Sequence, residues 1–135
     1  MNLNQKNVRW KQRFQNFKLA FMQLEAAVNL PKLNDLEASG LVQTFEYTFE
    51  LAWKTLKDYL ESEGISATTP RQVIQESFRA NIITDGHTWI DALEKRNLIA
   101  HTYNKELSNN ALNLIKNAYF PIIKNFLEAM EKKES

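Results

Sequence analysis

Residues 45–64 read FEYTFELAWKTLKDYLESEG, and the large apolar side chains in this stretch return every three or four positions. That spacing places them on one face of an α-helix. The face begins with Val42, three residues before this stretch, and continues with Phe45, Phe49, Ala52, Leu56 and Tyr59. Asn34 or Asp35 can cap the start of this helix, and Gly64 suits a left-handed terminator just after Glu63. The stretch therefore predicts one long helix with a buried face.

A second long helix is predicted over residues 7–29, N-terminal to the first. Its large apolar side chains recur at the same intervals, and they are Trp10, Phe14, Phe17, Phe21, Leu24 and Val28. Pro31 disfavours helix at Leu30, so the chain is expected to turn there. Because the connection to the next helix is short, the two long helices are expected to lie antiparallel.

The next two helices are predicted to be shorter. Thr69 can cap the first, with Pro70 at its opening position and an apolar set formed by Val73, Ile74, Phe78 and Ile82. The following helix is expected to begin near Thr84 or Asp85 and to end in or just after residues 96–104. Its core-facing side chains are expected to be Trp89, Ile90 and Leu93.

A last long helix is predicted over about residues 108–130. Its stripe is Ala111, Leu112, Ile115, Tyr119, Ile122, Phe126 and Met130. Pro121 removes one backbone hydrogen bond and is expected to bend this helix. The tail from about residue 131 is expected to fray.

Composition limits the fold and the partners. The 135 residues suit one domain, residues 1–135, and three Gly and three Pro are too few for many tight turns. We therefore predict an all-α, antiparallel four-helix bundle with a short additional helix.

The formal charge of +1 argues against a broad basic surface, and the lack of cysteine excludes disulfides and thiol nucleophiles. With no apolar run long enough for a membrane span and no apolar core of a signal peptide, we expect a cytoplasmic protein without membrane contact.

Three helices carry more apolar surface than one stripe each. Besides the core stripes, the extra side chains are Leu19 and Met22, Tyr47 and Leu51, and Phe120 and Leu127. A bundle helix that touches two neighbours needs a wide apolar face, which is one explanation. The other is a surface for a second copy or a partner, and on this basis we predict self-association.

Glu46, Glu50 and His87 each have a functional and a purely structural interpretation. Glu46 and Glu50 lie one turn apart, a spacing that permits paired-carboxylate chemistry or metal binding. A ladder of surface ion pairs also explains Glu50, which precedes Lys54 by four residues. His87 could join His101 at a metal, but no third ligand stands at a recognisable spacing, so we predict no metal site and place His87 at a helix start.

Residues 96–103, RNLIAHTY, bring together a guanidinium, an amide, an imidazole and a phenol. Asn97 and His101 share a helix face, whereas Arg96 and His101 differ by five residues, about 140° around the axis. One unbroken helix therefore cannot direct both into one site. Either the helix ends inside the segment, or two copies of the motif meet across a symmetric interface. A simpler alternative is that Arg96 pairs with a surface acid and His101 satisfies a helix end.

This segment resembles the signature of the HEPN superfamily, which is Arg, a polar residue, three further residues, His, any residue and Tyr. Residues 45–64, quoted above, resemble the corresponding helix of one HEPN branch, the nucleotidyltransferase substrate-binding proteins. Residues 70–104, PRQVIQESFRANIITDGHTWIDALEKRNLIAHTYN, are similar to the rest of that pattern. The resemblance covers roughly residues 8–130 and includes two separate motifs in order.

The resemblance implies a helical bundle that forms a homodimer with its two motifs adjacent. It also implies a partner, a separately encoded minimal nucleotidyltransferase. Related pairs act as toxin and antitoxin, in which the HEPN protein is a metal-independent endoribonuclease that needs no cofactor and leaves 2′,3′-cyclic phosphate ends. The nucleotidyltransferase silences it by attaching AMP to the motif tyrosine, which corresponds to Tyr103.

Under this hypothesis His101 acts as general acid or base on RNA, and Arg96 binds the scissile phosphate. Asn97 orients His101 or donates to a phosphate oxygen, Tyr103 positions RNA or the histidine, and Glu46 and Glu50 are possible supporting residues. The competing hypothesis is a non-catalytic substrate-binding or regulatory subunit of the nucleotidyltransferase. The near-neutral charge favours it mildly, because the cations near the motif are few: Lys95, Lys105, Arg71 and Arg79.

Overall fold

The computed structural model describes residues 2–100 and 105–135, apart from the side chains of residues 98, 100 and 105–108. This part of the chain is helical and contains no β-strand, as the sequence predicted. No helix in the described ranges is long and apolar enough to cross a membrane. In chain order the elements are α1 (Leu3–Val28), α2 (Asp35–Ser62), α3 (Pro70–Arg79), α4 (Gly86–Ala100), α5 (Lys105–Leu114), the π-helical turn η1 (Ile115–Tyr119) and α6 (Phe120–Glu134).

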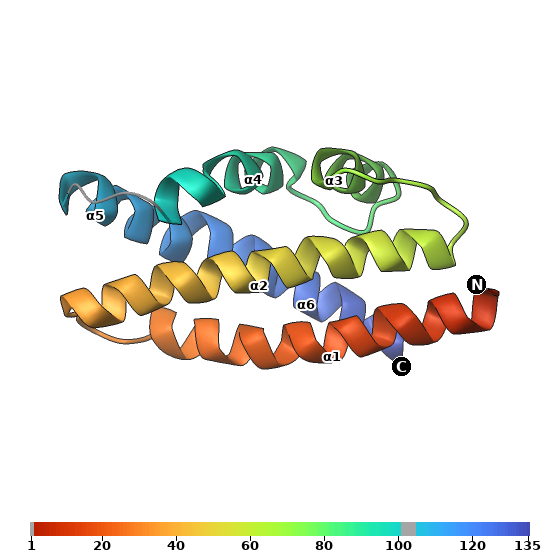
Figure 1. The fold of residues 1–135 in the computed structure, drawn as a ribbon, viewed down its shortest axis with the longest axis horizontal. Coiled ribbons are helices and arrows are strands. Elements are labelled where there is room, and N and C mark those ends of the chain that lie inside the picture. The colour runs from red at the N-terminus through yellow and green to blue at the C-terminus, as the bar shows by residue number, and fades with distance from the viewer. Residues whose placement is uncertain (1, 101–104) are drawn as a thin grey trace.

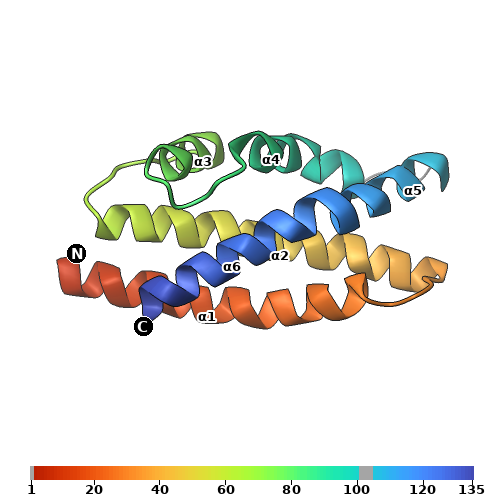
Figure 2. The same ribbon diagram turned by 180° about the vertical axis from the view of Figure 1, so that it is seen from behind.

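The helices form a bundle in which α1 and α2 lie side by side and antiparallel (Figure 1). The short α3 and the longer α4 follow one another along the other side of α2. Seen from behind, α6 runs diagonally across α1 and α2, and α5 lies beside the end of α4 (Figure 2). Four main helical segments and the short α3 therefore make the predicted bundle, with α5, η1 and α6 as one continuous segment.

Local capping explains the starts of α1, α2 and α3 and the end of α2. Asn34 caps α2 in a reciprocal capping box with Glu37, and Gly64 follows α2 with a φ of 79°. Thr69 caps α3 in the same way, with Pro70 at its first position. α1 begins earlier than expected, at Leu3, because Asn2 forms a capping box with Gln5.

The core is built from the predicted stripes and is rich in aromatic rings. Phe17 of α1 lies 5.0 Å from Phe126 of α6 between ring centroids, and Trp89 of α4 lies 5.7 Å from the same ring. Phe49 of α2 packs on Trp89 at 5.6 Å. Phe126 thus joins α6 to α1 and α4, while α2 is joined to the same cluster through Trp89. These rings are fully buried or nearly so. Burial of this apolar surface is the main force that holds the bundle together.

The expectation for the end of α3 was wrong in two respects. The helix ends at Arg79, because Asn81 adopts a left-handed conformation with a φ of 61°, so Ile82 of the predicted apolar set lies beyond the helix, although it is buried as expected. Phe78, which the spacing assigned to the core, is 52% exposed. Its ring covers Gly86 at the start of α4, where an added Cβ would meet the ring atoms at 3.2 Å. Val73 and Ile74 are buried as expected.

The last helix differs from the prediction at its irregular turn, at Phe120 and at its end. Just before Pro121 the helix widens into η1, where the Phe120 N–H donates to the Ile115 carbonyl. Phe120, expected on an outer strip, is buried and stacks on Phe21 of α1 at 5.4 Å. The tail is helical to Glu134, because the Glu134 carboxylate accepts hydrogen bonds from Gln15 at 2.6 Å and from Lys18 at 2.8 Å.

Candidate functional site

Arg96 lies in the last described turns of α4 and reaches across to α2. Its Nη1 donates to Oε2 of Glu50 at 3.0 Å. Glu50 also accepts a hydrogen bond from Nε1 of Trp53 at 2.9 Å and pairs with Nζ of Lys54 at 3.4 Å. The predicted Glu50–Lys54 pair is therefore present, and the same carboxylate holds the motif arginine. Arg96 does pair with an acid, as one alternative anticipated, but it stays part-exposed and within reach of a ligand.

The other motif residues divide between described and undescribed positions. Asn97 is exposed on α4, next to Arg96. His101 and Tyr103 lie outside the described residues, so the roles expected of them stay predictions. α4 is helical from Arg96 to Ala100, so the first five residues of the motif belong to one helix.

The two carboxylates Glu46 and Glu50, which the sequence placed one turn apart, differ in their contacts. Glu46 is half-buried one turn before Glu50, and it is Glu50 that reaches Arg96. Trp53, which orients Glu50, was not recognised from the sequence, although its position three residues later places it on the same face. Tyr47 precedes Glu50 by three residues and is 58% exposed, so an exposed aromatic ring borders the site.

His87 is exposed as the second residue of α4, which confirms its assignment to a helix start. Asp85 caps the helix by accepting hydrogen bonds from the backbone N–H and hydroxyl of Thr88 at 3.1 and 2.7 Å. Those two bonds lower the pKa of Asp85. Within residues 2–100 and 105–135, no three His, Asp or Glu side chains gather in a way that suits a metal ion.

The nearby cations named from the sequence are held by carboxylates. Lys95 pairs with Asp91 at 3.1 Å, Arg71 with Glu94 at 2.6 Å and Arg79 with Glu76 at 3.1 Å. The side chain of Lys105 is outside the described part of the chain. These pairs reduce the positive charge that α3 and α4 offer to an anion.

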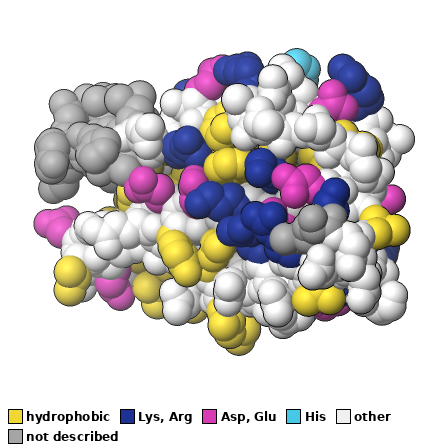
Figure 3. Space-filling model, turned by 45° about the vertical axis from the view of Figure 1, so that its right-hand side comes forward, with side chains coloured by type: hydrophobic (Ala, Val, Ile, Leu, Met, Phe, Trp, Pro, Cys, Tyr) yellow, Lys and Arg dark blue, Asp and Glu magenta, His cyan; other side chains and the backbone are white. Residues whose placement is uncertain are grey.

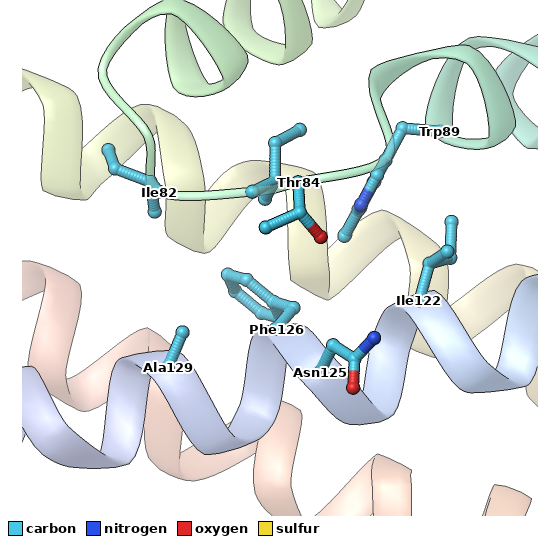
Figure 4. A pocket seen from close by; sticks show the side chains of 8 residues that line it. Ile82, Thr84, Trp89, Ile122, Asn125, Phe126 and Ala129 are labelled. Carbon is cyan, nitrogen blue, oxygen red and sulfur yellow. The ribbon is translucent and has the colours of Figure 1, made fainter.

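A small cavity of about 60 Å³, whose lining does not include Arg96 or Asn97, lies between the α3–α4 connection and α6 (Figure 4). Its lining is mostly apolar and includes Trp89, Ile122 and Phe126, with Thr84 and Asn125 as polar neighbours. Its volume suits a few water molecules rather than a nucleotide. The cavity therefore does not compete with the Arg96 surface as a substrate site.

α4 is anchored to η1 by a hydrogen bond from the Tyr119 hydroxyl to Asp91. That bond, supported by Lys95, lowers the pKa of Asp91, while burial and the Asp91 carboxylate raise the pKa of Tyr119. Asp91 lies five residues before Arg96. The Asp91–Tyr119 contact thus helps to fix the helix that carries the motif.

This contact predicts a pH dependence of stability at both ends of the range. The lowered pKa of Asp91 stabilises the fold above about pH 3.9, and this contribution is lost as the pH falls through the folded-state pKa. The raised pKa of Tyr119 stabilises the fold below about pH 10, and that contribution is lost as the pH rises further. Urea unfolding across this range is expected to show a shallower alkaline decline in Tyr119→Phe and a shallower acid decline in Asp91→Asn. Parallel profiles for all three proteins would contradict the assignment.

Comparison with known proteins agrees with this architecture. A family model described as "Nucleotidyltransferase substrate binding protein like" matches residues 12–132. The chain is 29% identical over 79 residues to the "Probable ribonuclease HepT" of Haemophilus influenzae, which covers 55% of this chain and 54% of the relative. The chain thus spans about half the length of the curated relative that it matches.

Two solved structures share the fold. A protein from Thermus thermophilus superposes with a TM-score of 0.74 at 26% identity, covering 87% of this chain and 98% of that protein. A Haemophilus influenzae protein, described as revealing the fold of a substrate-binding domain of a nucleotidyltransferase, has a TM-score of 0.63 at 22% identity. That match covers 96% of this chain and 99% of the other, and at this identity it concerns the fold alone.

Proposed function

The chain belongs to the family of nucleotidyltransferase substrate-binding-like proteins, and we propose that it is the helical partner of a separately encoded minimal nucleotidyltransferase. We further propose that it is the toxin of such a pair, a cytoplasmic endoribonuclease that needs no metal. The observation that carries this proposal is the placement of Arg96. Its guanidinium is held by Glu50 at the surface, in a sequence context that supplies Asn97, His101 and Tyr103 within seven residues.

The proposed chemistry uses a nucleophile that RNA itself provides. The ribose 2′-oxygen attacks the adjacent phosphorus, the bond from phosphorus to the 5′-oxygen breaks, and a 2′,3′-cyclic phosphate remains. One proton leaves the 2′-hydroxyl and one is delivered to the departing 5′-oxygen. His101 supplies this general acid–base function, since an imidazole titrates near neutral pH. Arg96 stabilises the extra negative charge of the transition state, and Asn97 assists from the same helix.

A homodimer is part of the proposal. Arg96 and His101 differ by about 140° around a regular helix, so motifs from two copies can together supply what one helix cannot. Exposed apolar side chains support self-association, because Leu19 and Met22 are 64% and 65% exposed on α1. Tyr103 is the proposed site at which the nucleotidyltransferase attaches AMP, which would place negative charge near Arg96.

Glu50 is proposed as a positioning residue that acts through Arg96. In Glu50→Gln the Arg96 guanidinium loses its charged acceptor, so the catalytic rate constant is expected to fall about tenfold as Arg96 moves from its productive position. Glu94→Gln removes an ion-paired carboxylate from the exposed face of α4 and is expected to keep the parental rate. Single-turnover cleavage of a labelled RNA measures both.

A double variant separates positioning from simple loss of folding. If Glu50 acts through Arg96, then Glu50→Gln combined with Arg96→Ala is no slower than Arg96→Ala alone. Multiplicative losses in the double variant, or an unchanged rate in Glu50→Gln, would remove Glu50 from this role.

The second candidate function is a non-catalytic substrate-binding or regulatory subunit of the nucleotidyltransferase. The formal charge of +1 and the carboxylate partners of Arg96, Lys95 and Arg71 favour it, because an RNA groove needs uncompensated positive charge.

Incubation of the purified protein with total RNA in EDTA decides between the two functions. Cleavage that leaves cyclic phosphate ends is expected. Light scattering on the same protein preparation, without RNA, is expected to give the mass of a dimer. The His101→Ala protein, purified in the same way, controls for contaminating ribonuclease. A folded dimer that leaves RNA intact would favour the regulatory subunit, and complex formation with the nucleotidyltransferase and AMP transfer to Tyr103 would then be measured.

A further inference from the structure

Lys and Arg side chains gather across the middle of one face of the molecule, with carboxylates between them (Figure 3). The ion pairs on α1, α2 and α4 identify a connected set of cations there. We call this set the basic band, and its members are Arg9, Arg13, Lys54, Lys57 and Arg96. The motif arginine stands at one end of the band, so the band is continuous with the candidate site.

The band follows a stripe of α2. Glu50, Lys54, Lys57, Asp58 and Glu61 stand at helical spacing on one side of this helix. Arg96 of α4 joins the stripe at Glu50, at a distance of 3.0 Å. Arg9 of α1 joins it at the other end, 3.9 Å from Glu61 and 3.6 Å from Asp58. The axial distance between the two ends is about 16 Å, at 1.5 Å per residue.

A buried acid lies beneath the basic band, and two of its cations cover that acid. Asp58 is 3% exposed and lies beneath Arg13, whose Nε is 2.6 Å from Oδ2, and beneath Arg9, which is 43% exposed. Five cations stand against the four carboxylates Glu46, Glu50, Asp58 and Glu61, a local net charge of +1. Because Asp58 is 3% exposed while Arg9 and Lys54 are 43% and 40% exposed, this surface presents positive charge to solvent although the whole protein is nearly neutral.

An exposed aromatic ring stands at the motif end of the band. Tyr47 precedes Glu50 by one turn on the same stripe of α2 and is 58% exposed. A positively charged track beside an exposed ring is the arrangement that binds single-stranded nucleic acid, in which cations follow the backbone and bases stack on the ring.

We propose that the basic band binds the phosphates of single-stranded RNA and leads the strand to Arg96, with a base stacked on Tyr47. This inference rests on the proposed ribonuclease function and adds a substrate path to it. The ion pairs along the band do not block it, because exposed pairs contribute roughly 0–1 kcal/mol and a phosphate can exchange with their carboxylates. The buried Asp58 keeps Arg13 in place while Arg9, Lys54 and Lys57 meet the strand.

The test is binding of a short labelled 2′-O-methyl RNA, which has no free 2′-hydroxyl and so reports binding without cleavage. Fluorescence anisotropy is followed over a range of salt concentrations for the unchanged protein and for Arg9→Gln/Lys54→Gln/Lys57→Gln. Three lost phosphate contacts are expected to weaken binding about tenfold or more at low salt and to reduce the slope of log K against log salt by about 2. Tyr47→Ala is expected to weaken binding with little change in that slope, because stacking releases no counterions.

The matched control, Lys32→Gln/Lys124→Gln/Lys132→Gln, removes the same formal charge from exposed positions outside the band and is expected to keep the parental affinity and slope. Lys54→Gln/Lys57→Gln leaves the Arg9 and Arg13 contacts of Asp58 intact, so a reduced slope there excludes misfolding around that carboxylate.

Equal losses in the band and control variants, or no RNA binding by the unchanged protein, would overturn the inference. A band variant that binds RNA normally but no longer binds the nucleotidyltransferase would also overturn it, and would identify a protein-docking surface. Cleavage of ordinary RNA by the unchanged protein is scored separately. RNA binding through the band without cleavage would therefore reject the proposed nuclease while keeping the band as an RNA-binding surface.

Discussion

His101→Ala is expected to slow RNA cleavage by a factor of about 10² to 10⁴, the range over which a positioned general acid or base contributes. Removal of the imidazole leaves no group in the motif that titrates near neutral pH. Binding is expected to change little, because Arg96 and the rest of the basic band remain. Single-turnover rates at saturating RNA separate the chemical step from binding.

The chain contains one other histidine, which gives a matched control. His87 is exposed at the start of α4, so His87→Ala is expected to cleave at the parental rate. If His101→Ala cleaves RNA as fast as the unchanged protein, His101 is not catalytic and the activity comes from another group or a contaminant. If both variants lose activity equally, the loss reflects structure rather than proton transfer.

Phe17→Ala is expected to lower the free energy of unfolding by about 3–5 kcal/mol, the largest effect on stability proposed for this chain. The Phe17 side chain has no exposed surface, and its ring lies among Phe14, Phe21 and Phe126. The substitution removes apolar contacts and leaves a cavity between α1 and α6 that neighbouring rings cannot easily fill. Urea unfolding followed by circular dichroism measures the difference.

Leu19→Ala, two residues along the same helix, is the comparison for that result. Leu19 is 64% exposed, so its truncation is expected to change stability by no more than about 0.5 kcal/mol. A large loss in Leu19→Ala at concentrations where the protein is oligomeric, but not when it is dilute, would instead place Leu19 in an interface between copies. Equal small effects of both substitutions would contradict the packing of α1 described above.

Much of the fold was readable from residues close together in the chain. Asn34, Thr69 and Gly64 mark helix ends through hydrogen bonds and backbone preferences that span only a few residues. The apolar stripes identified the buried faces of the long helices, because the period of a helix is set by its own backbone. The motif around Arg96 was visible for the same reason, as its residues are neighbours in sequence.

The expectations that failed concern contacts between distant segments. Phe78 continues a helical stripe but covers Gly86 at the surface, and Phe120 lies off its stripe but stacks on Phe21. The C-terminal turn remains helical because Glu134 meets Gln15 and Lys18 of α1. Periodicity identifies the face of a helix that is apolar, but it does not say how far a neighbouring helix covers that face.

The sequence by itself determined that this protein is helical, roughly where its long helices begin and end, and which residues form its signature motif, because these depend on local backbone geometry and residue order. Only the tertiary structure decided that Glu50 holds Arg96 across 46 residues and that Arg13 covers Asp58 across 45. Both contacts depend on the packing of α1 and α4 against α2. The apolar pattern of one helix does not specify how a neighbouring helix is aligned along it. The site and the basic band depend on that alignment.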